Sequence, residues 1–149
     1  MEIESLVRKN ILKLKPYTSA RGDHMTGILL DANENSFGSV VEDEWNVGLN
    51  RYPDPFHNKL REELCAYLNV SKDNLFIGVG SDEIIDLVVR IFCEPKIDNA
   101  ITLEPTYGMY KVVCDINEVS TIPIQLDKSY QPDLEKIYSS ITKNTKVIF

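Results

Sequence analysis

Regular apolar patterning is weak in the first 54 residues of the chain and strong in the rest. Residues 2–15 place apolar side chains close to helical spacing, and Pro16 ends the pattern, which predicts one N-terminal helix followed by a loop. Residues 17–55 carry a short apolar run at 28–30 and then many Asn, Ser, Gly, Pro and Asp residues, which favour turns. We therefore expect residues 1–54 to form a helix and an arm.

From residue 55 onward, strand-like apolar runs alternate with helical patterns. Strands that alternate with helices are typical of βαβ units on a parallel sheet. We therefore predict an α/β fold with a mostly parallel sheet, in which residues 55–149 form an incomplete large domain. The expected helices cover residues 55–69, 81–93, 107–116 and 132–141, and the expected strands cover residues 75–79, 100–104, 119–126 and the run that starts at 145.

The expected helix over residues 81–93 is apolar around most of its circumference, with Asp86 and Arg90 as its polar members. Such a helix requires burial inside a larger body than a small lone domain provides. The last apolar run, residues 145–149, resembles the start of a strand with no turn after it. We therefore expect the complete fold to continue beyond this sequence.

Charge and composition narrow the class of partner. A net charge of −7 argues against a nucleic acid or an anionic membrane, because either partner requires a basic surface. The sequence has no apolar run long enough to span a bilayer and no signal-peptide pattern, so we expect a cytoplasmic protein with small-molecule ligands. Cys65, Cys93 and Cys114 are far apart and odd in number, which favours reduced packing residues over disulfides or a metal site.

The segment from Gly78 to Glu83 passes through a glycine-rich turn into a predicted helix. The free N–H groups and the positive end of a helix dipole favour phosphate at such a turn. Two alternatives stay open. Ser81 or Asp82 could simply cap the helix. A dinucleotide site would use Glu104 for the ribose, but Glu83 stands where its third glycine is needed.

Two tyrosines are placed to meet a ligand. Tyr107 follows the expected strand over residues 100–104, and residues at the carboxyl ends of parallel strands line ligand crevices. Its ring could cover a planar ligand, or Tyr107 and Tyr110 could merely pack one helical face. Tyr52 lies on a turn restricted by Pro53 and Pro55, to which spacing alone assigns no role.

Six short segments stand in the order and spacing of the signatures of one known family: Pro-Tyr-Thr-Ser-Ala-Arg at 16–21, Leu-Asp-Ala-Asn-Glu-Asn at 30–35, Arg-Tyr-Pro-Asp-Pro at 51–55, Gly-Ser-Asp-Glu at 80–83, Phe-Cys-Glu-Pro at 92–95 and Pro-Thr-Tyr-Gly-Met-Tyr at 105–110. The chain thereby resembles the N-terminal portion of histidinol-phosphate aminotransferases, enzymes of fold type I that depend on pyridoxal 5'-phosphate (PLP). The resemblance extends from about residue 6 to the end. Threonine-phosphate decarboxylases share the general plan but are less similar.

The resemblance implies an activity and a set of site residues. Amino transfer would run between histidinol phosphate and 2-oxoglutarate, giving imidazole acetol phosphate and glutamate in histidine biosynthesis, within a homodimer. It implies that the phosphate of PLP is held by Gly80, Ser81 and Asp82, that Tyr107 stacks on the PLP ring, and that Tyr52 reaches the phosphate in the neighbouring subunit. It places Tyr17, Asn33 and Asn35 on the substrate side.

The resemblance also implies what these residues lack. The lysine that forms a Schiff base with PLP, and the acid beside the ring nitrogen, would lie beyond Phe149 in this family, so we expect the 149 residues alone to be inactive. Either the chain is part of a longer enzyme, or it is a non-catalytic phosphate-binding or structural remnant. A smaller departure is Ser36-Phe37, where proline is common, and only a local backbone effect is expected there.

Overall fold

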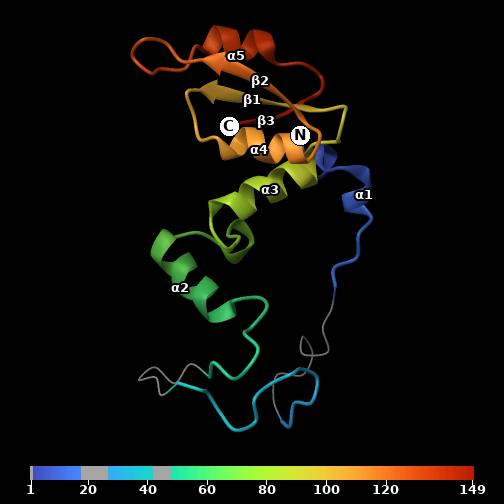
Figure 1. Cartoon of the computed structure of the whole chain (residues 1–149), viewed down its shortest axis with the longest axis vertical. Coiled ribbons are helices and arrows are strands. Elements are labelled where there is room, and N and C mark those ends of the chain that lie inside the picture. Colours follow the sequence, from blue (N-terminus) through green and yellow to red (C-terminus); the bar gives the residue numbers. More distant parts are fainter. Residues whose placement is uncertain (1, 18–26, 42–47) are drawn as a thin grey trace. The chain divides into compact units, whose positions relative to one another are not determined.

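The computed structural model describes residues 2–17, 27–41 and 48–149 (Figure 1). The chain divides into two compact units. The first unit combines Met1–Leu14 with Gly78–Phe149, and the second unit is Lys15–Ile77. The expected domain boundary between residues 54 and 55 stays a prediction.

A three-stranded parallel sheet forms the centre of the first unit. Its strands are β1 (Asn99–Glu104), β2 (Ser120–Gln125) and β3 (Thr145–Ile148), in the order β2-β1-β3. β1 pairs with β2 in continuous register from Asn99↔Ser120 to Glu104↔Gln125, and its pairing with β3 is irregular after Asn99. The sheet confirms the predicted parallel α/β class.

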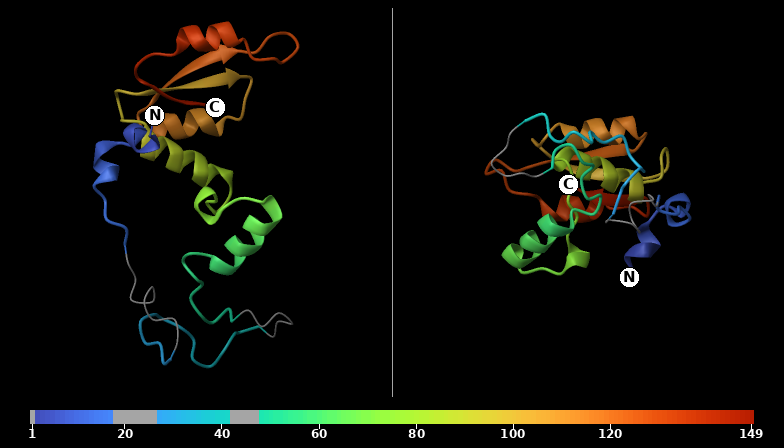
Figure 2. Two further views of the ribbon diagram at one scale, coloured as in Figure 1. Left: turned by 180° about the vertical axis from the view of Figure 1, so that it is seen from behind. Right: turned by 90° about the horizontal axis from the view of Figure 1, so that it is seen from below.

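Helices cover both faces of this sheet (Figures 1 and 2). α4 (Met109–Ile116) connects β1 to β2, and α5 (Leu134–Ser140) connects β2 to β3 on the other side of β1. Right-handed crossovers that run in opposite directions along a sheet place their helices on opposite faces. Alternate residues of β1 accordingly enter two apolar clusters. The cluster beneath α4 contains Val89, Cys93, Ala100, Val113, Cys114 and Val119, and the cluster beneath α5 contains Ile101, Ile124 and Ile137.

α3 (Ser81–Phe92) packs beside α4 and carries the apolar circumference noted in the sequence. Of the residues of α3, Val89 is the one that is fully buried within this unit, while Ile84, Ile85 and Leu87 are half-buried. α3 has 12 residues. Among the described residues, no helix combines the length and the apolar character that a membrane crossing requires.

The N-terminal segment differs from the single helix predicted over residues 2–15, so that prediction is wrong. It forms a 3-10 helix, η1 (Ile3–Leu6), and one helical turn, α1 (Lys9–Leu12). Between them the backbone is extended at Val7 and Arg8. The break has a tertiary cause, because the Arg8 N–H donates to the carbonyl oxygen of Ile91 at 2.9 Å and cannot continue a helix.

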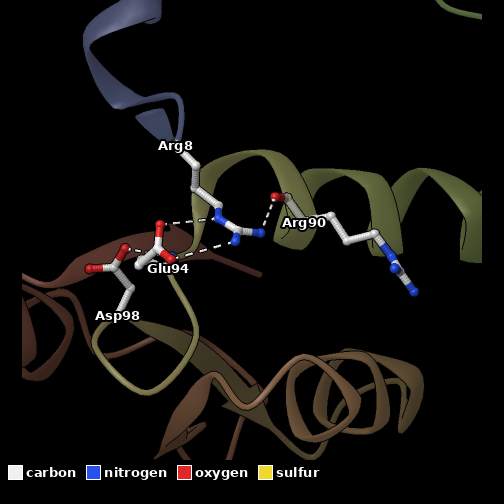
Figure 3. A network of polar contacts seen from close by, with 4 residues as sticks. All are labelled: Arg8, Arg90, Glu94 and Asp98. Carbon is white, nitrogen blue, oxygen red and sulfur yellow. Dashed lines mark hydrogen bonds and ion pairs between the residues drawn. The ribbon is translucent and has the colours of Figure 1, made fainter. Parts of the chain in front are cut away.

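The Arg8 side chain fastens this segment to the end of α3 (Figure 3). Its Nε lies 3.2 Å from Oε2 of Glu94, and its Nη1 donates to the Arg90 carbonyl oxygen at 2.9 Å. The Glu94 N–H in turn donates to the buried Asp98 carboxylate at 2.8 Å. Arg8 therefore satisfies carbonyls of the last turn of α3 that have no partner within the helix.

The second unit contains α2 (Asn58–Leu68), which confirms the helix predicted over residues 55–69, and the short η3 (Lys72–Asn74). The strand predicted over residues 75–79 does not form. A strand requires a neighbouring strand for its hydrogen bonds, and here the Leu75 carbonyl instead accepts from Nη1 of Arg61 at 3.1 Å.

The three cysteines are free, and all are buried. Cys93 and Cys114 pack in the cluster beneath α4, and Cys65 is the buried residue of α2. Burial raises the pKa of the Cys93 thiol to about 12 and also raises the pKa of the Cys114 thiol. Their burial agrees with the prediction that the three cysteines are packing residues.

Candidate functional site

The N-terminus of α3 begins at the glycine-rich turn singled out in the sequence. Gly80 is the N-cap residue, with φ 83° and ψ 169°, and no side chain caps the helix. The alternative in which Ser81 or Asp82 is the N-cap is therefore wrong, since both lie within the first turn. Glycine adopts this positive φ without a steric cost, and the space where a Cβ would stand at Gly80 is open. The backbone is thus accessible to a ligand here.

Both carboxylates of this first turn are bound to protein groups. Glu83 folds back and accepts a hydrogen bond from the Val79 N–H. A Cβ at Gly78 would lie 2.8 Å from Oε2 of Glu83, so glycine leaves room for this folded carboxylate. Asp82 accepts from the hydroxyl of Tyr107, at 3.1 Å to Oδ1 and 3.3 Å to Oδ2. Both acids are therefore held by protein donors, Glu83 by the turn itself and Asp82 by Tyr107.

Hydrogen-bond donors remain at this helix end. Among the described residues, the backbone N–H groups of Gly80, Ser81 and Asp82 have no protein acceptor. Three neighbouring N–H groups and the positive end of a 12-residue helix suit an anion. The geometry fits the phosphate end of the PLP that the resemblance implies.

Tyr107 stands at the carboxyl end of β1 and is 51% exposed. Its ring meets Tyr110 edge-on, with centroids 5.8 Å apart, and Tyr110 stacks on Phe149 at 4.6 Å. The hydrogen bond to Asp82 is the main cause that raises the pKa of the Tyr107 phenol. Three rings thus run from the end of β1 to the residue after β3, and the first of them keeps an exposed surface for a planar ligand.

The second unit joins two of the segments that carry the family resemblance. Glu34 accepts from the Tyr52 N–H at 2.7 Å through Oε1, and from Nη1 of Arg51 at 2.7 Å through Oε2. Asn35 accepts a bond from the Asn50 side chain through its backbone oxygen. Sequence reasoning assigned Glu34 no role. An acid 17 residues before an arginine gives no periodic signal, so only the folded chain reveals this pair.

The other predicted site residues of this unit are exposed. Tyr17 is 92% exposed and Tyr52 is 58% exposed. Asn35 organises its own turn, since its side chain accepts from Phe37 N–H and donates to the Gly38 carbonyl. For the Tyr17 and Asn33 side chains, the described part of the chain provides no hydrogen-bond partner.

A groove of about 440 Å³ lies elsewhere in the first unit, between the N-terminal segment and β3. None of the predicted site residues lines it. Its charged residues are of both signs, and Arg8, Glu94 and Asp98 are already bound to one another or to backbone groups. We therefore assign the candidate site to the N-terminus of α3 and not to this groove.

Comparison with known proteins identifies relatives over nearly the whole chain. A sequence profile of the family described as aminotransferase class I and II matches residues 26–149. The chain is 48% identical to histidinol-phosphate aminotransferase of Christiangramia forsetii, across 99% of this chain and 41% of that protein. It is 43% identical to the enzyme of the same name from Parabacteroides distasonis, again across 99% of this chain and 41% of that protein.

A solved structure gives a consistent picture. The crystal structure of the histidinol-phosphate aminotransferase from Clostridium acetobutylicum aligns with a TM-score of 0.53 and 28% identity. The alignment covers 62% of this chain and 26% of that one. The chain thus spans about two fifths of the length of the curated relatives it matches.

Proposed function

The chain belongs to the family of class I and II aminotransferases, and on that premise we propose that it is part of a histidinol-phosphate aminotransferase. The enzyme would transfer an amino group between histidinol phosphate and 2-oxoglutarate in histidine biosynthesis, in the cytoplasm. Enzymes of this family use PLP. The name and the 48% identity of the Christiangramia forsetii relative support this choice of substrate.

The observation that carries the proposal is the arrangement at the N-terminus of α3. We propose that the N–H groups of Gly80, Ser81 and Asp82 hold the phosphate of PLP, while the ring of Tyr107 covers its pyridine ring. PLP, when bound, supplies an electron sink. The residues of this chain would bind and orient it. The carboxylate of Glu83 is occupied by a hydrogen bond from the Val79 N–H.

We further propose substrate and subunit contacts for the second unit. Tyr17, Asn33 and Asn35 would contact the phosphorylated substrate, and Tyr52 would donate its hydroxyl to the phosphate of PLP in the opposite subunit of a homodimer. The proline-flanked turn and the Glu34 contact to the Tyr52 N–H support this role, because they fix the backbone from which the Tyr52 side chain extends.

A chimera tests the activity. Residues 1–149 would replace the aligned N-terminal part of the Christiangramia forsetii enzyme, in a bacterium that requires histidine because it lacks its own histidinol-phosphate aminotransferase. We expect growth without histidine. Ser81→Asp adds a carboxylate to the phosphate site and should lower PLP affinity by about tenfold or more, because like charges repel at short range. Ser120→Asp, at the exposed first residue of β2, is the matched control and should leave PLP affinity unchanged.

The outcomes separate the proposals. A folded chimera that binds PLP but transfers no amino group contradicts the activity, and decarboxylation of threonine phosphate would identify the related enzyme instead. A folded chimera that binds no PLP contradicts the phosphate site as well. In that case the chain would be a structural remnant.

Mixed dimers test the role of Tyr52. Subunits of the chimera carrying Tyr52→Phe would be combined with subunits that lack the PLP-bonding lysine. A shared site predicts that both lesions fall in one site and leave the other with normal PLP affinity. If every functional site has the weakened affinity of the Tyr52→Phe homodimer, Tyr52 acts within its own subunit and the proposal is wrong.

A further inference from the structure

The first turn of α3 and the loop after β1 are joined by one side-chain contact. Tyr107 lies in that loop, and its hydroxyl donates to both carboxylate oxygens of Asp82, 25 residues earlier in the sequence. Asp82 therefore makes its backbone and its side chain available to different partners. Its backbone N–H is among the free donors at the helix end, and its carboxylate is directed to the phenol.

The ring of Tyr107 is restrained at two points. One edge contact is with Tyr110, at 89° between the ring planes, and Tyr110 is itself braced by stacking on Phe149. The hydroxyl is held by Asp82. A half-exposed tyrosine without the second restraint would be free to change rotamer, and fixing it on binding costs side-chain entropy. The Asp82 carboxylate removes that freedom before a ligand arrives.

We propose that Asp82 is a positioning residue whose carboxylate holds the Tyr107 ring in place to cover the cofactor ring. This inference rests on the proposed function and deepens it, because one residue would then set the phosphate end and the ring end of the site together. Asp82 takes no part in the chemistry. Its charge is engaged by a hydroxyl donor, so it does not turn toward the phosphate.

The charge of Asp82 has a measurable effect in the absence of any ligand. A carboxylate that accepts from a phenol stabilises the neutral phenol, and the pKa of Tyr107 is raised for that reason first. Replacing the carboxylate by an amide keeps an acceptor oxygen but removes the charge. Asp82→Asn should therefore lower the pKa of Tyr107 toward the ordinary tyrosine value of 10.0 and keep part of the positioning.

A titration without cofactor tests the contact. Tyrosine labelled with carbon-13 at Cζ would be followed by NMR against pH in the 149-residue chain and in the cofactor-free chimera, with the Tyr107 signal assigned from Tyr107→Phe. We expect its midpoint to fall in Asp82→Asn and Asp82→Ala. Asp115→Asn, which removes an exposed carboxylate bound to Lys111 on α4, is the matched control and should leave the midpoint unchanged. A midpoint that does not respond to Asp82 overturns the proposal.

A double-mutant cycle on PLP affinity tests the role. In the chimera, Asp82→Ala and Tyr107→Phe should each weaken PLP binding by about fivefold, the usual effect of one hydrogen bond. The double variant should bind PLP no more weakly than either single variant. Asp82→Asn should bind PLP more tightly than Asp82→Ala, because the amide keeps an acceptor oxygen. Losses that multiply to about 25-fold would mean that Asp82 acts independently of Tyr107, which overturns the proposal. If the unsubstituted chimera binds no PLP while the Tyr107 midpoint still responds to Asp82, the proposed function fails and the contact stands.

Discussion

Arg8→Ala should release the N-terminal segment from α3. The hydrogen bond from Nη1 to the Arg90 carbonyl at 2.9 Å involves a charged donor whose side chain is 16% exposed, and such bonds contribute about 1.5 kcal/mol. The ion pair with Glu94 adds only about 0.5 kcal/mol, because the Glu94 side chain is 45% exposed. The local free energy of opening should therefore fall by about 2 kcal/mol, which is about thirtyfold in the opening equilibrium.

Hydrogen exchange at the backbone measures this opening directly. The N–H of residue 8 donates to the Ile91 carbonyl in both proteins, because the substitution keeps the backbone. Its protection against exchange reports the fraction of time that the segment is detached. We expect protection to fall by about thirtyfold in Arg8→Ala. Arg8→Lys keeps the charge near the end of α3 but loses the forked geometry of the guanidinium group. The protection of its residue 8 N–H should therefore lie between that of the unsubstituted protein and that of Arg8→Ala.

Lys9→Ala is the matched control for this experiment. Lys9 is the next cation in the chain, is exposed, and forms no ion pair within the described residues. Protection at residue 8 should change by less than about twofold, as for surface substitutions in general. Equal losses in Arg8→Ala and Lys9→Ala would refute the reasoning and assign the anchoring to apolar contacts instead.

Three further outcomes are expected. Asp133 caps α5 and accepts from the Lys136 N–H, which is the main reason that the pKa of Asp133 is lowered. The stability that this cap contributes is present above pH 3.8 and is lost as the pH falls through the lower folded pKa. Asn is also a good cap but does not titrate, so Asp133→Asn should remove this pH dependence from the free energy of unfolding in urea. Burial raises the pKa of the Cys93 thiol to about 12 and leaves its side chain 1% exposed, against 9% for Cys65, so peptide mapping at pH 8 should show iodoacetamide reacting at Cys65 before Cys93. Equal rates would contradict this. Borohydride reduction of the 149 residues with PLP should label no lysine stoichiometrically, and a single fully labelled lysine in the peptide map would disprove the expected absence of the Schiff-base lysine.

The sequence by itself determined the elements of the α/β core. The apolar runs and helical patterns after residue 80 predicted α3, β1, α4, β2, α5 and β3 in order. These predictions succeed because each face of a strand or helix is buried or exposed as a unit, and that burial repeats with the period of the local backbone. The family signatures likewise located the turn at Gly80 and the loop at Tyr107.

Only the tertiary structure decided which residues meet. Arg8 breaks the N-terminal helix because its N–H binds Ile91, and residues 75–79 form no strand because no neighbouring strand pairs with them. The contact of Asp82 with Tyr107 joins positions 25 apart, and that of Arg51 with Glu34 joins positions 17 apart. Periodicity records whether a side chain faces the core, but it carries no information on its partner, because a hydrogen bond is set by the packing of whole elements in space.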